Sequence, residues 1–135
     1  MRRLFPIVLM AAVLGGCSAG KDTAASQQAV TQFHHQLDAG QYDAIYDGSG
    51  GELKALTSKP DFVALLDAIH RKLGAVKEAK QVAWNVNYNT GGGTISLTYQ
   101  TQFASGSSTE EFVYRTGQPP ALIGYHIQSN DLMTK

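Results

Sequence analysis

The chain contains a single cysteine, Cys17, among its 135 residues. One cysteine cannot form a disulfide within the chain, so we expect the folded part to depend on side-chain packing alone. It also excludes a structural zinc site built from several thiolates. Four roles remain for Cys17: a buried core residue, a nucleophile, a metal ligand or the attachment point of a lipid.

Charged residues are also scarce, at 16% of the chain, and the acidic and basic groups are equal in number. A nucleic-acid-binding domain usually carries a basic patch, so we expect no nucleic-acid partner. The apolar run at residues 4–13 is about half of the roughly 20 residues that a transmembrane helix needs. We therefore do not expect this run to be a transmembrane helix.

The surroundings of Cys17 favour lipid attachment. Arg2 and Arg3 precede the apolar run, and Leu14-Gly15-Gly16-Cys17 follows it. This order predicts a secretory signal peptide over residues 1–16. The tetrapeptide resembles the bacterial lipobox, in which the cysteine is linked to diacylglycerol and becomes the first residue of the mature chain. An ordinary signal peptide that happens to contain a cysteine is the alternative.

Lipidation would determine where the protein resides. Acyl chains such as palmitate contribute about 0.8 kcal/mol per buried methylene, so two or three of them hold a protein on the membrane. Ser18, in place of an aspartate, resembles the pattern that directs enterobacterial lipoproteins to the outer membrane. We expect a protein anchored in the bacterial cell envelope, at the outer membrane and facing the periplasm. Residues 17–26 are small and polar and predict a lipidated tether.

Residues 27–135 predict a single α+β domain. Apolar residues recur every three or four positions in residues 27–39, 42–47 and 58–73, which predicts three helices. From Val82 onward the period is two, which predicts four antiparallel strands with short turns. An apolar sheet face needs a cover, and the helices are the available elements. We expect helices packed on a curved four-stranded antiparallel sheet, as a half-open cone.

Four segments carry a resemblance to a known group of proteins: FHHQLDAGQYDAIYD, FVALLDAIHRKLGAVK, ISLTYQTQFASGSSTEEFVYR and LIGYHIQ. They are similar to small bacterial envelope proteins of unknown function with a nuclear-transport-factor-two-like, or cystatin-like, fold. The resemblance covers about residues 29 to 128 and implies the cone-shaped fold. Members of this wider fold include enzymes, ligand binders and protein-interaction modules, so the resemblance leaves the function open.

The histidines give no pattern for metal binding. His34 and His35 are adjacent on a predicted helix and point about 100° apart, so they do not converge on one ion. The sequence has no His-x3-His or Cys-His spacing, and we expect no metal and no cofactor. His70 and His126 are interpreted as residues at the margin of the core.

The carboxylates give no catalytic pair. Glu110 and Glu111 are placed beside a hairpin, and no acidic pair is forced into the apolar interior. We therefore assign no catalytic residue.

Aromatic residues are the stronger indication of a site. Several fall on faces predicted to point into the cone, where they either fill the core or line a small apolar pocket. The candidate pocket residues are Phe33, Tyr42, Tyr46, Trp84, Tyr88 and Tyr99.

The opposite face of the predicted sheet is polar but uncharged, which suits either plain solvation or contact with a second copy or an envelope partner. Its residues are Asn85, Asn87, Ser96, Thr98, Gln100 and Gln102.

These features favour a membrane-anchored envelope lipoprotein that acts as a binding or protein-interaction module. A small enzyme with its active site in the cone is the alternative. A structural accessory that assembles through the polar sheet face is a third hypothesis.

Overall fold

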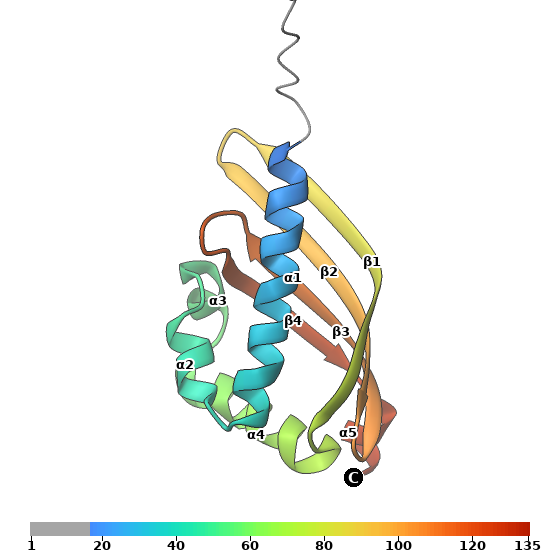
Figure 1. Ribbon diagram of the computed structural model, residues 1–135. Helices are drawn as coiled ribbons and strands as arrows, with labels where there is room; N and C mark the ends of the chain where they lie inside the picture. The colour runs from blue at the N-terminus through green and yellow to red at the C-terminus, as the bar shows by residue number, and fades with distance from the viewer. Residues whose placement is uncertain (1–16) are drawn as a thin grey trace, which may run out of the picture.

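A computed structural model describes the backbone of residues 17–135 and the side chains of residues 19–135 (Figure 1). The predicted signal peptide at residues 1–16 lies outside the described residues. The elements are α1 (Cys17–Asp38), α2 (Tyr42–Asp47), α3 (Gly51–Leu56), α4 (Lys59–Leu73), β1 (Val76–Asn89), β2 (Gly92–Phe103), β3 (Gly106–Arg115), β4 (Ala121–Gln128) and α5 (Asn130–Thr134). None of the helices in this part of the chain has both the length and the apolarity to cross a membrane.

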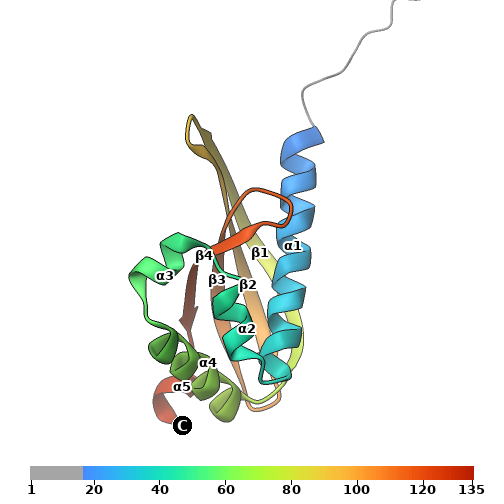
Figure 2. The same cartoon turned by 90° about the vertical axis from the view of Figure 1, so that its left-hand side faces the viewer.

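The predicted α+β architecture is confirmed. The four strands form one antiparallel sheet in the order β1-β2-β3-β4, with each strand paired to its neighbour in sequence. The sheet is curved, and α1 lies across its concave face, with α2 and α3 beside it on the β4 side (Figures 1 and 2). The short α3 and α5 were not predicted, because each has fewer than two turns and little apolar periodicity.

The core forms between α1, α4 and the concave face of the sheet. The clearest predicted helix, α4, begins after Ser58, whose side chain accepts a hydrogen bond from the Asp61 N–H at 3.3 Å. It ends at Gly74, whose φ of 80° suits a residue without a side chain. The alternation in β2 and β3 is confirmed, since every second residue is buried. The fully buried core residues include Leu37, Leu66, Ile69, Leu73, Ile95, Leu97 and Phe112.

The first helix begins earlier than the sequence suggested. In place of the expected tether at residues 17–26, α1 is a continuous helix of 22 residues from Cys17 onward. Side chains along this stretch contact β1: the Tyr88 hydroxyl donates to Asp22 at 2.8 Å, and Gln27 donates to Gln81 at 2.7 Å. The alanines at 19, 24 and 25 favour helix, and together with these contacts they continue the predicted helix toward its N-terminus, although this stretch has no apolar stripe.

The edge strand β1 also differs from the prediction. Trp84 and Tyr88 were expected in the interior, but they are 63% and 50% exposed. Trp84 pairs with the buried Leu97, so it does face the same side of the sheet as the core residues. The alternating pattern predicts the face correctly, but it does not reveal that no element covers this part of an edge strand.

Candidate functional site

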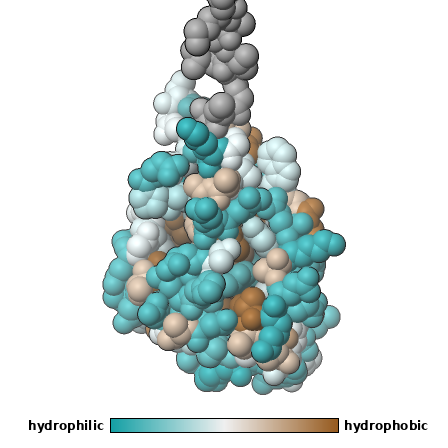
Figure 3. All heavy atoms as spheres, in the orientation of Figure 1, coloured by the Kyte–Doolittle hydropathy of each residue, from teal (hydrophilic) through white to brown (hydrophobic). Residues whose placement is uncertain are grey.

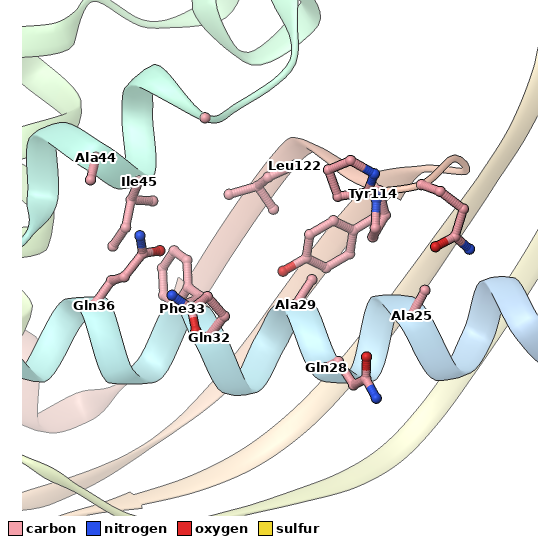
Figure 4. Close-up of a pocket in the computed structure, with 14 residues that line it drawn as sticks. Ala25, Gln28, Ala29, Gln32, Phe33, Gln36, Ala44, Ile45, Tyr114 and Leu122 are labelled. Carbon is pink, nitrogen blue, oxygen red and sulfur yellow. The ribbon is translucent and has the colours of Figure 1, made fainter.

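A groove of about 470 Å³ lies between α1, α2 and the loop that joins β3 to β4 (Figure 4). Helix α1 supplies one side, where Gln28, Gln32 and Gln36 are spaced four residues apart and so form a row along one face. Phe33 lies on the same side, and Ile45 faces it from α2. We call this space the α1–α2 groove.

The loop between β3 and β4 supplies the opposite side of the α1–α2 groove. Gln118, Pro119 and Pro120 line it there, followed by Leu122 at the start of β4. Every side chain that lines the groove is uncharged, so the surface combines apolar groups with neutral amides. A ligand with a full charge would lose hydration in this groove without gaining a charged partner. The lining therefore favours an uncharged ligand.

Tyr114 at the end of β3 is the one phenol in the α1–α2 groove. Its side chain is only 3% exposed, and its ring stacks on Phe112 with the two ring centroids 6.4 Å apart. In Figure 4 its hydroxyl points toward α1. Within the described residues this hydroxyl forms no hydrogen bond, but it is not fully buried and can be reached from the groove. Burial also holds the pKa of Tyr114 well above its ordinary value, so the hydroxyl remains a neutral donor and acceptor.

The inside of the cone is filled by aromatic rings. The rings of Phe33, Phe112 and Tyr125 pack against one another with centroids 4.9 to 5.1 Å apart. Tyr99 packs edge-on against Phe112 at 5.9 Å. The α1–α2 groove lies at the mouth of the cone, outside these packed rings. Of the predicted pocket residues, Phe33 and Tyr99 pack inside the cone, as in the alternative in which the aromatics fill the core.

A buried carboxylate lies behind these rings. Glu110, four residues into β3 after the β2–β3 hairpin, is 0% exposed, a burial that the sequence analysis did not predict. Its Oε1 accepts from His34 Nε2 at 2.8 Å and from the Thr101 hydroxyl at 2.6 Å, and its Oε2 accepts from the Tyr125 hydroxyl at 2.5 Å. We call these four residues the Glu110 cluster.

The register explains why Glu110 is inside. It pairs with Tyr99 and Ile127, whose side chains face the helices, while Glu111 pairs with Thr98 and His126 on the outer face. Strand alternation therefore places Glu110 inside despite its polar side chain. Because its oxygens already accept three hydrogen bonds, the Glu110 cluster is a self-contained network with a structural role.

Comparison with known families adds one finding. Residues 29–118 match the model of a family described as "Protein of unknown function (DUF4019)". The chain belongs to this family. No curated protein is similar enough to the chain to count as a match. The segment matched to the DUF4019 family includes Gln32, Phe33 and Tyr114 of the groove and three members of the Glu110 cluster, His34, Thr101 and Glu110.

The structure brings only one of the six predicted pocket residues of this DUF4019 protein into the groove, namely Phe33. Tyr46 donates to the Thr57 carbonyl at 2.9 Å, and Tyr42 is half-buried at the edge of the core. Tyr99 belongs to the core, while Trp84 and Tyr88 are exposed on β1. Sequence reasoning missed Tyr114 and the glutamine row. The four-residue spacing of the glutamines was a usable signal, since it puts three neutral amides on one helix face.

The side chains described here contain no group of three or more histidine, cysteine, aspartate or glutamate residues arranged to hold a metal ion. The chemistry that the α1–α2 groove offers is hydrogen bonding by amides and one phenol beside apolar surface. This suits binding rather than acid or base catalysis.

The buried tyrosines predict a loss of stability at high pH. Burial raises the pKa of Tyr114, and burial followed by the charge of Glu110 raises the pKa of Tyr125. Both stay protonated in the folded state, whereas in the unfolded state they lose their protons near pH 10. The free energy of unfolding should be unaffected by these tyrosines below about pH 10 and should fall above it, by up to about 1.4 kcal/mol per pH unit for each tyrosine.

Tyrosinate absorbance and circular dichroism, followed together in one titration, check this expectation. The absorbance of the buried tyrosines should rise only as the helical signal is lost. Full ionisation of all six tyrosines while the dichroism stays native would contradict it. A Tyr125→Phe variant should show a smaller decline, because one of the two groups is removed.

Proposed function

We propose that this protein is a lipid-anchored module of the bacterial cell envelope that binds an uncharged, extended segment of a partner protein in the α1–α2 groove. The observation that carries the binding role is the uncharged lining of the groove, to which the largely buried Tyr114 presents its hydroxyl. The lipobox-like sequence that ends at Cys17 supports the anchor, and Ser18 supports the outer membrane. The resemblance of the sequence also supports a nuclear-transport-factor-two-like, or cystatin-like, domain.

The shape of the groove favours a chain segment over a small molecule. A small ligand is usually enclosed over most of its surface, but this groove is partly open to solvent. Gln28, Gln32 and Gln36 present amides that can both donate to and accept from a peptide backbone.

The absence of charge defines the kind of segment. A lysine or aspartate held in the groove would be partly desolvated beside apolar rings and neutral amides, without an opposite charge. The expected occupant therefore has uncharged residues where it contacts the groove. Its backbone amides would pair with the glutamines, and one of its polar groups would pair with the Tyr114 hydroxyl.

Selection from a peptide library tests this proposal. The full-length protein, purified from membranes, is used to select from random eight-residue peptides displayed on phage. We expect the recovered peptides to lack charged residues at their central positions. A single aspartate introduced there should weaken binding by roughly tenfold or more, since one unpaired and partly buried charge costs at least about 1.4 kcal/mol. Recovered peptides that are mainly acidic or basic would overturn the proposal.

The alternative hypotheses have less support. An enzyme with its site in the cone would need open space there, but aromatic rings and the fully hydrogen-bonded Glu110 occupy the interior. Assembly through the outer sheet face has no comparable observation in its favour. Gln100 on that face already donates to Thr109 of the same sheet at 3.0 Å.

A further inference from the structure

Large apolar and aromatic side chains are exposed along the second half of β1. Val82 is 51% exposed, Trp84 63% and Tyr88 50%. A register shift between Gln81 and Ala83 leaves Val82 unpaired, whereas Trp84 and Tyr88 pair with Leu97 and Gly93 on one side of the sheet. We call the side chains of Trp84 and Tyr88 the β1 aromatic face. Their rings are mainly apolar and each ends in a polar group, so they can contact a second surface.

The β1 aromatic face lies beside the start of α1. The Tyr88 hydroxyl donates to Asp22 at 2.8 Å, and Asp22 is about 8 Å along the helix axis from Cys17. The tip of the β1–β2 hairpin and the first turn of α1 lie at the same end of the molecule in both views (Figures 1 and 2). The end of the domain that carries Cys17 is therefore also the end that displays these rings.

This end of the molecule is free of charge along the hairpin. No charged residue and no histidine occurs between Lys80 and Glu110, so both strands of the hairpin beyond Lys80 are neutral. Contact with lipid headgroups would then require no desolvation of a charged side chain on the hairpin. Tryptophan and tyrosine are the residues that concentrate at the membrane interface, because their rings are apolar and carry a polar group.

We infer that the β1 aromatic face rests on the lipid surface, with Trp84 and Tyr88 in the headgroup region next to the anchor. This inference rests on the proposed lipid attachment at Cys17. In Figure 1, β1 lies on one side of α1, while α2 and the β3–β4 loop lie on the other. A domain held in this way presents the α1–α2 groove away from the membrane, where a periplasmic partner can reach it.

A lipid surface fits the β1 aromatic face better than a second copy of the chain. Two partly exposed side chains offer at most about 500 Å², whereas a stable dimer buries about 800 Å² on each partner. The face of the molecule around α1, seen in Figure 3, is otherwise mainly hydrophilic and does not extend the apolar area. An anchored domain needs only a small additional contact, because the anchor already holds it at the membrane.

Trp84 is the only tryptophan in the chain and is therefore a specific fluorescent probe. Full-length protein purified from membranes is reconstituted into phosphatidylcholine vesicles with or without brominated acyl chains. The protein should float with the vesicles, its emission should shift to shorter wavelength, and brominated lipid should quench roughly half of its intensity or more, as expected for an interfacial indole.

Two charge variants make the test specific. Tyr88→Glu places a charge on the same face of β1 as Trp84 and should reduce the quenching severalfold, because a charge at this depth is unfavourable. Met133→Glu changes a side chain that is 80% exposed on α5, at the opposite end of the molecule, and should leave the quenching unchanged. Circular dichroism of both variants establishes that they are folded.

The outcomes separate the two proposals. Protein that floats with vesicles while Trp84 emits as in water, unquenched, would overturn the inference and leave the anchor intact. Protein that stays in solution would overturn both. Emission at shorter wavelength without quenching by brominated lipid, together with a crosslinked dimer, would assign the β1 aromatic face to a second copy and also overturn the inference.

Discussion

Replacement of Glu110 by alanine is expected to lower the free energy of unfolding by about 3–5 kcal/mol. The substitution leaves His34, Thr101 and Tyr125 in the interior without the acceptor that they share. Each unsatisfied buried donor is costly, and the removed side chain also leaves a void. Domains of this size have about 5–15 kcal/mol in total, so the loss would be a large fraction of the stability. Urea denaturation followed by circular dichroism measures it.

Glu111 provides a matched control because it is the next residue on the same strand. It faces the outer side of the sheet, where it pairs with Thr98 and His126. Glu111→Ala should change the free energy of unfolding by no more than about 0.5 kcal/mol. If the two variants were equally stable, the Glu110 cluster would have no structural role.

Replacement of Cys17 by serine is expected to abolish lipid attachment completely. In the proposed anchor, a diacylglycerol would be joined through a thioether, which needs the cysteine sulfur, and its acyl chains would supply the membrane affinity. The variant should remain an uncleaved precursor and incorporate no radiolabelled palmitate in growing cells. The wild-type protein should be labelled and should sediment with membranes.

Ser18→Ala is the control for the palmitate experiment. It changes the neighbouring residue and keeps the sulfur of Cys17, so labelling should persist. Palmitate incorporated into the Cys17→Ser variant would show that the acyl group is attached elsewhere, and the anchoring proposal would fail.

The parts of the fold that could be predicted are those where one periodic pattern decides the structure. Ser58 and Gly74 mark the ends of α4, and the apolar stripe between them identifies its buried face. In β2 and β3 the alternation is sufficient, because both strands are internal to the sheet and each has a neighbour on both sides.

Patterns failed where burial depends on neighbours from elsewhere in the chain. Trp84 faces the side of the sheet that its alternation indicates, but β1 is an edge strand and its end has no cover. Glu110 is buried because α1 brings His34 to it across 76 positions of sequence. Burial of a carboxylate is costly without hydrogen-bond partners, and the three donors around Glu110 reduce this cost. No local pattern in the sequence indicates these partners.

The candidate site was hard to predict for the same reason. The α1–α2 groove combines α1, α2 and the β3–β4 loop, and no local pattern indicates that these segments meet. Phe33 was correctly selected as an aromatic residue on an inward face of a helix. Tyr114 was missed because the strand pattern alone does not separate a core tyrosine from one at the rim of the core.

We propose that the α1–α2 groove is the binding surface, so a substitution that fills the groove should block peptide binding. Ala44 lines the groove from α2 and is exposed, so Ala44→Trp should block the groove without disturbing the core. Ala55→Trp introduces the same side chain at an exposed position of α3 that is not part of the groove.

The decisive measurement is the dissociation constant of a selected uncharged peptide, obtained by fluorescence polarisation for the wild type and both variants. We expect Ala44→Trp to weaken binding by at least about tenfold, or 1.4 kcal/mol, and Ala55→Trp to leave it unchanged. Equal affinity of the wild type and a folded Ala44→Trp variant would contradict the account.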